Sequence, residues 1–267
     1  RRMTDKTKHI NDGLPDLFCE SLQKKYGDSV LAIVLYGSWL RGQRDTVIDL
    51  YVLLDSYKAL NSTTHSVLNS LVAPNVYLAT INVNDEEFSA KYATITKVDF
   101  ERKIRHDLHS YFWARFAQPS EILYAKSKKI ASQLDDIFLI AARRLVNETV
   151  PMLPDTFSTS CLWKKAFELT YRCELRSESK NTPEMLSDSM KHHIWTLTPS
   201  IATQCKLIPT GEHEWRRSQS LPKNFYCKFR WTSRTYWGKF LSIARLLKAL
   251  VTFDSPLEYL VWKIERH

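Results

Sequence analysis

Apolar positions in the first half of the chain recur with the spacings of one helix and several strands. Over 14–27 they recur every three or four residues, which predicts a helix that ends at Gly27. The runs 30–36 and 47–54 are almost continuously apolar and rich in branched residues, as in strands buried on both faces. This half is therefore expected to form a mixed α/β sheet, with two further apolar stretches at 76–81 and around 91–95, separated by the acidic turn NDEE.

The second half has mainly helical periodicity. Apolar residues at helical spacing predict helices over 98–117 and 121–150, with Pro119 between them. A turn bounded by prolines at 151–157 precedes a further predicted helix. The polar stretch 177–223 has no period from which helices or strands can be assigned.

A basic amphipathic helix is predicted near the C-terminal end, over 236–253. One face carries apolar residues and the only charges are basic: Leu241, Ala244, Leu247 and Val251 share the face, and the charges are Lys239, Arg245 and Lys248. The expected architecture is an α/β domain (1–117), a mainly helical domain (118–223) and a basic amphipathic C-terminal segment (224–267).

Composition and charge narrow the classes of protein. Of 267 residues, 44% are hydrophobic and 25% charged, which is typical of a globular protein and not of a disordered chain. The 38 Lys and Arg exceed the 29 Asp and Glu, and a net charge of +9 suits a polyanionic partner: nucleic acid, a nucleoside triphosphate or an anionic bilayer. No stretch is apolar enough to predict a transmembrane helix.

Cysteine spacing and the N-terminal residues bear on the compartment. The five cysteines include no pair at two-residue spacing, which disfavours a zinc site or a disulfide framework. Reduced thiols in an intracellular compartment are therefore expected. The first 13 residues lack the apolar core of a signal peptide.

One arrangement between the first two predicted strands carries chemistry. The first strand runs into Gly37-Ser38, and Asp49 interrupts the apolar run of the second. A glycine lets a phosphate approach the backbone, and N–H groups of a helix starting near Ser38 would favour phosphate oxygens. A carboxylate inside an apolar strand needs a cation, and Mg²⁺ carried by substrate phosphates is a natural one. The alternative is an ordinary Gly-Ser turn with Asp49 bonded to backbone.

The arrangement resembles the nucleotidyltransferase superfamily, whose signature is Gly-Ser followed by an Asp-x-Asp strand. Val47 stands at the first of those two Asp positions. A strand with a single Asp, preceded by Tyr-Gly-Ser, is the pattern of the mitochondrial-type phosphatidate cytidylyltransferases. The chain is similar to it at Tyr36-Gly37-Ser38 and at Ile48-Asp49-Leu50.

Four later segments extend this resemblance in the same order. KYATI, YFWARFAQP, MLPDTF and LTYRCELR are similar to the family's Lys-Tyr-Gly-Val-Ile, Leu-Tyr-x-Ala-Gly-Arg-Leu-x-Lys-Pro, Leu-Pro-Glu-x-Phe and Leu-Ser-Tyr-x-Gly-Asp-x-Arg. The resemblance covers 36–176, and SRTYWGKFLSIARLLKA and SPLEYLVWKIER are similar to the family's last segment. A divergent member is indicated by the departures: Ala93, Ala114 and Cys173 replace glycines, Trp39 replaces the Gly after Ser, and Glu174 replaces an Asp.

The resemblance implies a Mg²⁺-dependent enzyme that transfers CMP from CTP to phosphatidic acid, giving CDP-diacylglycerol and pyrophosphate. The lipid phosphate would attack the α-phosphorus in line, so no covalent protein nucleophile is needed. On the matching positions, Tyr36, Gly37 and Ser38 would hold the triphosphate, and Asp49 would bind Mg²⁺.

A second carboxylate is expected to complete the metal site. Glu174 matches the family's acid; its alternative is a solvated charge at a helix end. Asp55 shares the strand face of Asp49 and can reach the site only if that strand is short. Asp85 and Glu86 are further candidates.

Three cations are expected to balance the charge of CTP: Lys91, Arg115 and Arg176. Lys91 would act as a point charge, and its alternative is a surface lysine on a strand edge. Arg115 follows three apolar or aromatic residues, so a specific anion should face it, either substrate or a carboxylate of the protein.

The C-terminal helix predicts attachment to an anionic membrane surface. Trp237, Phe240 and Phe253 suit the bilayer interface, and the positive charge suits anionic lipid. The alternative is a helix that packs on the core with its basic face in solvent. A lipid substrate favours attachment and predicts an intracellular, peripheral membrane enzyme on a cytoplasmic or mitochondrial inner face.

Two other functions stay open. One is a nucleotidyltransferase with a soluble acceptor, such as an antibiotic, a protein or an RNA. The other is a non-catalytic module that holds lipid or nucleic acid, suggested by Val47 and weakened because the resembling family also has a single Asp there. Nucleic acid is the less favoured partner.

Overall fold

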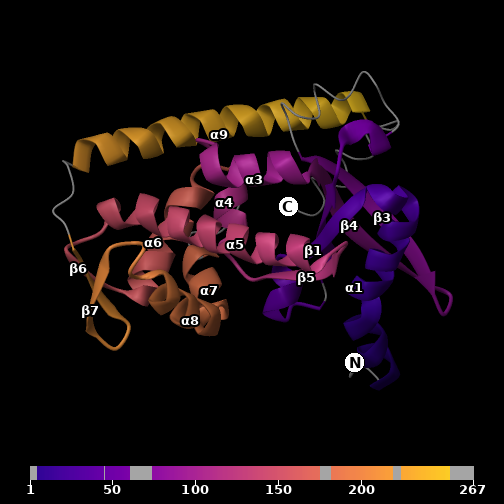
Figure 1. Ribbon diagram of the computed structural model, residues 1–267, viewed down its shortest axis with the longest axis horizontal. Helices are drawn as coiled ribbons and strands as arrows, with labels where there is room; N and C mark the ends of the chain where they lie inside the picture. Colours follow the sequence, from indigo (N-terminus) through magenta and orange to yellow (C-terminus); the bar gives the residue numbers. More distant parts are fainter. Residues whose placement is uncertain (1–4, 45, 61–73, 175–181, 219–223, 253–267) are drawn as a thin grey trace. The chain divides into compact units, whose positions relative to one another are not determined.

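The computed structural model describes residues 5–44, 46–60, 74–174, 182–218 and 224–252 (Figure 1). The chain divides into two compact units. The first unit combines the residues up to His106 with Phe116–Ala141, and the second combines Asp107–Arg115 with the residues from Ala142 onward. This grouping differs from the division at 117 expected from the sequence, because Phe116–Ala141 returns to the first unit.

A five-stranded mixed sheet forms the centre of the first unit, in the order β3-β4-β2-β1-β5. The β2 and β4 strands pair in parallel, and the other neighbours pair antiparallel. This confirms the expected α/β character of the first half. The strands are β1 (Val30–Tyr36), β2 (Ile48–Leu54), β3 (Asn75–Val83), β4 (Glu86–Thr96) and β5 (Ser120–Ala125).

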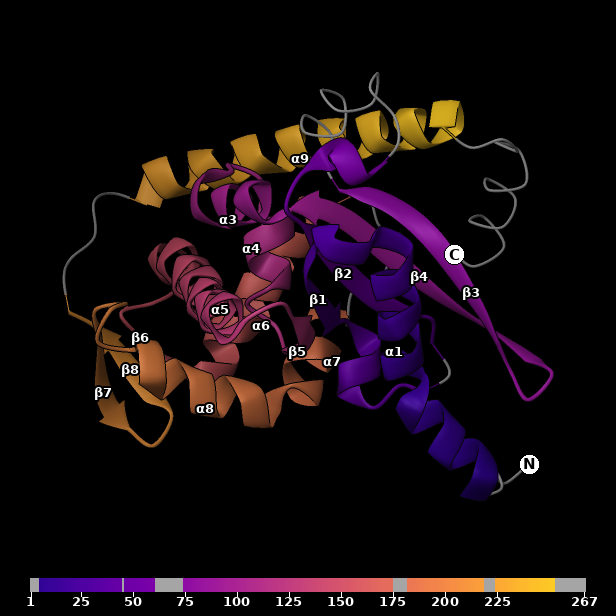
Figure 2. The same ribbon diagram turned by 45° about the vertical axis from the view of Figure 1, so that its right-hand side comes forward.

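Both faces of the two central strands are buried, which explains their continuous apolar runs. Helix α1 (Asp5–Tyr26) covers one face through Leu14, Phe18 and Leu22 (Figure 2). It begins earlier than the apolar pattern predicted and ends where expected, before Gly27 with its φ of 54°. On the other face, aromatic rings pack together: Tyr36, Tyr51, Phe100 of α3 (Lys97–His106) and Phe116.

Two helices predicted from periodicity are wrong in part. The first, over 98–117, is broken into α3 and α4 (Tyr111–Arg115), because the carbonyl of Asp107 accepts hydrogen bonds from Trp113 Nε1 and Arg144 instead of continuing a helix. The second, over 121–150, begins only at Lys128, because the residues before it form β5 and pair with β1. A short half-buried strand next to a long helix has no period of its own to mark it.

The second unit contains a three-stranded sheet in the order β6-β8-β7 with helices between its strands (Figure 2). One strand, then helices, then a hairpin whose last strand pairs with the first, is the topology of a winged helix. It accounts for much of the stretch that the sequence left unassigned. The elements are β6 (Thr156–Ser158), α6 (Thr159–Tyr171), α7 (Thr182–Ser189), α8 (Lys191–Ile201), β7 (Leu207–Gly211) and β8 (Glu214–Arg217).

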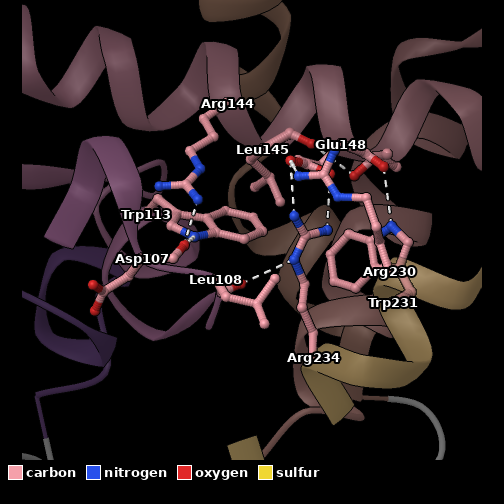
Figure 3. Close-up of polar contacts among 10 residues, drawn as sticks. Asp107, Leu108, Trp113, Arg144, Leu145, Glu148, Arg230, Trp231 and Arg234 are labelled. Carbon is pink, nitrogen blue, oxygen red and sulfur yellow. Dashed lines mark hydrogen bonds and ion pairs between the residues drawn. The ribbon is translucent and has the colours of Figure 1, made fainter. Parts of the chain in front are cut away.

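Helix α9 (Asn224–Thr252) is longer than the predicted helix over 236–253. Its inward face carries Trp231, Arg234 and Gly238, which are buried. Arg234 and Trp231 bond to Glu148 near the end of α5 (Lys128–Thr149) (Figure 3). Among the described residues, no helix is both long and apolar enough to cross a bilayer.

Candidate functional site

Gly37 and Asp49 lie against each other where β1 ends and β2 begins. Gly37 has φ 91° and ψ −153°, a conformation that side chains rarely allow. A Cβ atom built on Gly37 would lie 3.0 Å from Asp49 Oδ2, so the carboxylate occupies the space beside a bare backbone. The structure thus brings together the two residues that the sequence had placed in one site.

A row of side chains crosses three strands at this point. Tyr36 pairs with Asp49 across β1 and β2, and Asp49 pairs with Lys91 across β2 and β4. Residues directly opposite in neighbouring strands share a face, with Cβ atoms about 5 Å apart. Tyr36 is buried, Asp49 half-buried and Lys91 exposed. The row therefore leads from the core to solvent, with Lys91 at the position next to Asp49 on the neighbouring strand.

Aromatic rings form the floor under Asp49. Tyr51 lies two residues along β2 and so on the same face. Its ring centroid is 5.0 Å from that of Tyr36 and 5.1 Å from that of Phe116. Close-packed rings hold the strand ends rigidly, so Asp49 stands on a preorganised surface.

The loop after Gly37 is closed by its own hydrogen bonds. Ser38 Oγ lies 2.7 Å from Thr46 Oγ1, and Thr46 Oγ1 donates to the carbonyl of Gln43 at 2.8 Å. The Gln43 N–H donates in turn to the Ser38 carbonyl. The expected helix at Ser38 is a 3₁₀ helix, η2, of four residues (Ser38–Arg41), so it offers backbone N–H groups but little of a helix dipole.

Trp39 and Arg44 fix the same loop from the other side. Trp39 is buried, and the Arg44 guanidinium carbon lies 4.6 Å from the centroid of its ring. Arg44 also donates to the Trp39 carbonyl at 3.0 Å. Trp39 is thus an anchor of the loop.

Asp55 does not join Asp49. Strand β2 runs to Leu54, so Asp55 lies six residues, or about 20 Å, from Asp49 along the strand. Its N–H donates to the Ser29 carbonyl at the opposite end of the sheet. The expectation that Asp55 completes the metal site is therefore wrong, because the strand is too long. Asp85 in the β3–β4 turn and Glu86 at the start of β4 are also separated from Lys91 by several residues.

Two other candidates belong to the second unit, and their roles at Asp49 stay predictions. Arg115 ends α4, and its guanidinium carbon lies 4.3 Å from the centroid of the Tyr111 ring. Glu174 is half-buried just after α6, where its N–H donates to the Tyr171 carbonyl. Arg176 lies outside the described residues.

The donor set at Asp49 fits a magnesium ion that arrives with phosphates. Within the described parts of the chain, no three His, Cys, Asp or Glu side chains gather where they could hold a metal ion. Mg²⁺ is usually bound by one or two carboxylates together with waters and substrate phosphates. The half-buried Asp49 carboxylate beside the bare Gly37 backbone provides one such ligand.

Thr46 is a residue of this site that the sequence did not point to. It lies in a polar loop without periodicity, and its contact with Ser38 depends on how that loop folds. Comparison with known protein families and with curated proteins finds no match to this chain.

Proposed function

We propose that this protein is a Mg²⁺-dependent nucleotidyltransferase that transfers CMP from CTP to phosphatidic acid, releasing pyrophosphate. The observation that carries the proposal is the Gly37–Asp49 contact, with Lys91 paired beside Asp49. A bare backbone at Gly37, a carboxylate at Asp49 and a lysine on the next strand are groups that a metal–triphosphate complex needs. The choice of CTP and of a lipid acceptor comes from the sequence resemblance.

Each residue of the row has a separate task in this proposal. Asp49 would hold Mg²⁺, which when bound neutralises charge on the transferring phosphoryl group. Lys91 would pair with the triphosphate as a point charge. The Gly37 and Ser38 backbone would admit the phosphates, and Tyr36 would hold the strand end from the core. Phosphoryl transfer depends mostly on such positioning and charge neutralisation.

The variant Asp49→Asn tests the proposed role of the Asp49 carboxylate, because asparagine has nearly the same shape without the charge. The assay follows label from α-³²P-CTP into CDP-diacylglycerol, with phosphatidic acid in detergent micelles and Mg²⁺. The amide binds Mg²⁺ far more weakly than the carboxylate, so we expect a loss of about 100-fold or more in rate. Asp55→Asn is the matched control, because it removes a carboxylate from the other end of the same strand; its rate should stay within about twofold.

The outcomes separate the proposal from its alternatives. Lipid product from the wild type but not from Asp49→Asn supports it. CTP binding without lipid product would point to a soluble acceptor. Neither binding nor product, or equal rates for wild type and Asp49→Asn, would overturn the enzymatic proposal and leave a non-catalytic module.

Attachment to an anionic bilayer through α9 is the second part of the proposal. Its outward face exposes a row of large apolar residues, although the helix packs on the second unit through its other face. All of α9 carries six Lys or Arg and no Asp or Glu. Aromatic rings among basic residues suit the interface of an anionic membrane. The row consists of Tyr226, Phe229, Tyr236, Trp237, Phe240 and Ile243.

The centre of this row is also hollowed. A groove of about 520 Å³ is lined by Leu108, Ser233, Tyr236, Trp237 and Phe240. The exposed fractions of Tyr236, Trp237 and Phe240 are 73%, 47% and 58%. Of the apolar face predicted from the sequence, Leu241 is half-buried, and the side chains of Ala244, Leu247 and Val251 lie outside the described ones.

Vesicle sedimentation tests the attachment. The protein should sediment with phosphatidylcholine vesicles that contain phosphatidylglycerol, and much less with phosphatidylcholine alone. Trp237→Ser with Phe240→Ser should release it, and Lys239→Gln should weaken binding by about 1 kcal/mol. Met185→Ser is the control, since Met185 is an exposed apolar residue of α7. Binding that is equal for the double variant and the wild type would contradict a membrane role for this face.

A further inference from the structure

Counting the donor hydrogens shows which hydroxyl donates in the Ser38–Thr46 hydrogen bond. Thr46 Oγ1 has one hydrogen, and the Gln43 carbonyl can only accept, so Thr46 gives its hydrogen to Gln43. In the 2.7 Å contact between the two hydroxyls, Ser38 must then be the donor. The chain of bonds runs from Ser38 to Thr46 to Gln43.

This direction matters because Ser38 also has a single hydrogen. A phosphate oxygen accepts hydrogen bonds and does not donate them, so Ser38 can serve a phosphate only by turning its hydrogen away from Thr46. Thr46 can then turn its own hydrogen from the Gln43 carbonyl to Ser38 Oγ. A hydroxyl that accepts one hydrogen bond becomes a better donor in the next. The hydrogen bond between Ser38 and Thr46 can therefore form with either hydroxyl as the donor.

The same threonine holds the backbone of the loop. Its hydroxyl donates to the Gln43 carbonyl, and the Gln43 N–H donates to the Ser38 carbonyl at 3.2 Å. Together the two bonds close the loop. Gly42, with φ 84°, makes the turn between them and donates to the Trp39 carbonyl. Removing the Thr46 hydroxyl would thus free both the Ser38 side chain and the loop.

We propose that Thr46 is a positioning residue, which holds the Ser38 hydroxyl and the backbone of residues 38–43 ready for a phosphate group at the Gly37–Asp49 contact. The inference rests on the proposed function for the identity of that phosphate, but not for the hydrogen-bond relay itself. The Thr46 hydroxyl accepts a hydrogen bond from Ser38 in this structure, and it donates one to Ser38 Oγ when a phosphate oxygen accepts the hydrogen bond from Ser38.

Two measurements test the role. Titration calorimetry with CTP and Mg²⁺ gives the Kd, and the steady-state assay with phosphatidic acid micelles gives KM and kcat. We expect Thr46→Val to raise the Kd and the KM for CTP by about three- to tenfold, the range of one or two ordinary hydrogen bonds, with kcat changed less than twofold. Thr46→Ser keeps the hydroxyl and should bind CTP like the wild type. Thr196→Val is the matched control: it removes an exposed threonine hydroxyl that bonds to a backbone carbonyl in α8.

A double-mutant cycle separates a relay through Ser38 from a general loss of structure. If Thr46 acts through Ser38, the effect of Thr46→Val should largely disappear in a Ser38→Ala background. Equal and additive losses in both backgrounds would overturn the relay. Wild-type affinity in Thr46→Val would also overturn it.

Amide hydrogen exchange reads the loop without any ligand. Exchange in residues 38–46 should quicken in Thr46→Val and stay unchanged in Thr46→Ser and Thr196→Val. A wild type that does not bind CTP refutes the proposed function, whereas unchanged exchange in Thr46→Val refutes the positioning role; the two failures are therefore distinct.

Discussion

Arg234 donates from Nη1 to Glu148 Oε2 across 2.8 Å, and its side chain is 0% exposed (Figure 3). Its Nε donates to the Leu108 carbonyl at 2.9 Å, and Arg230 bonds to the other Glu148 oxygen at 2.7 Å. The guanidinium carbon of Arg234 also lies 4.8 Å from the centroid of the Trp231 ring. Two cations and one carboxylate thus join α9 to α5 inside the second unit.

Removing the carboxylate of this cluster should destabilise the protein strongly. Glu148→Gln leaves the Arg234 charge buried without its counterion, and we expect a loss of about 3–5 kcal/mol in the free energy of unfolding. Urea unfolding followed by circular dichroism measures it. Glu168→Gln is the control, because Glu168 pairs with Lys165 and Arg172 near the surface and should cost less than about 1 kcal/mol. Equal costs for the two would contradict the central role of Glu148.

Gly238 permits the close approach of α9 to its neighbours. A Cβ there would lie 2.2 Å from the Cys173 carbonyl oxygen and 2.4 Å from His109 Nε2, both buried. Gly238→Ala should therefore lower the free energy of unfolding by about 1–3 kcal/mol, despite the better helix propensity of alanine. Gly13→Ala in α1 meets nothing within 4 Å and should stabilise by about 0.5–1 kcal/mol. Thermal unfolding of both variants should shift in opposite directions.

Alanine variants of two glycines can distinguish the effect of backbone strain from that of crowding at the site. Gly37 and Gly42 have φ values of 91° and 84°, so alanine at either should cost about 1–3 kcal/mol of stability. Only at Gly37 would the new Cβ meet a neighbour, Asp49 Oδ2. We expect Gly37→Ala to weaken CTP binding in the presence of Mg²⁺ by more than tenfold and Gly42→Ala by less than threefold. Equal losses in calorimetry would mean that strain alone explains both.

The Tyr57–Asp99 hydrogen bond should make part of the stability depend on pH. Tyr57 Oη donates to Asp99 Oδ2 at 2.8 Å. Burial alone would raise the pKa of Asp99, but hydrogen bonds from Arg102 and Tyr57 outweigh it, so the pKa lies below its usual value. A lowered pKa in the folded state stabilises above the unfolded pKa, about 4, and this contribution is lost as the pH falls through the folded value.

Tyr57→Phe should accordingly cost about 1 kcal/mol at pH 7 and less at pH 3. Urea unfolding at the two pH values measures the difference from the wild type. Tyr226→Phe, at an exposed position, should change neither value. A cost of Tyr57→Phe that is the same at pH 3 and pH 7 would show that the carboxylate is not its partner.

Cysteine reactivity should report the packing of both units. Cys161 is exposed, whereas Cys19, Cys173 and Cys205 are buried. Burial raises the pKa of Cys205 to about 12 and raises those of Cys19 and Cys173 above the usual value. Iodoacetamide at pH 8 should therefore modify Cys161 first, as peptide mass spectrometry can follow, and reach the buried thiols only in urea. Cys205 reacting as fast as Cys161 in the folded protein would contradict the buried position.

The central strands were predictable because burial on both faces leaves a mark in the sequence. The run 30–36 is confirmed as β1, and 47–54 as β2 apart from its first residue. Their succession also predicted that Gly37 and Asp49 lie together, since a chain that leaves one strand and enters its antiparallel neighbour must bring those ends side by side. Local pattern and short connections sufficed for this much of the candidate site.

Long-range partners left no such mark. Strand β5 had no period to distinguish it from the helix that follows, and its pairing with β1 joins residues some ninety positions apart in sequence. Arg234 lies before the helix predicted over 236–253 and had no sequence pattern to single it out, although in the fold it is buried against Glu148. Asp55 had the right face of its strand but the wrong end, which depends on where β2 stops.

Only the tertiary structure decided which way individual side chains point and which group donates in each hydrogen bond. Residue order along the chain places Ser38 and Thr46 in one loop, but their 2.7 Å contact and its direction depend on how that loop closes. Periodicity likewise marks α9 as amphipathic, whereas packing selects which face is covered, because Gly238 alone admits the close contact with Cys173 and His109 at that point of the helix. Patterns in sequence record burial averaged over an element; the chemistry of a site depends on single contacts between residues that folding brings together.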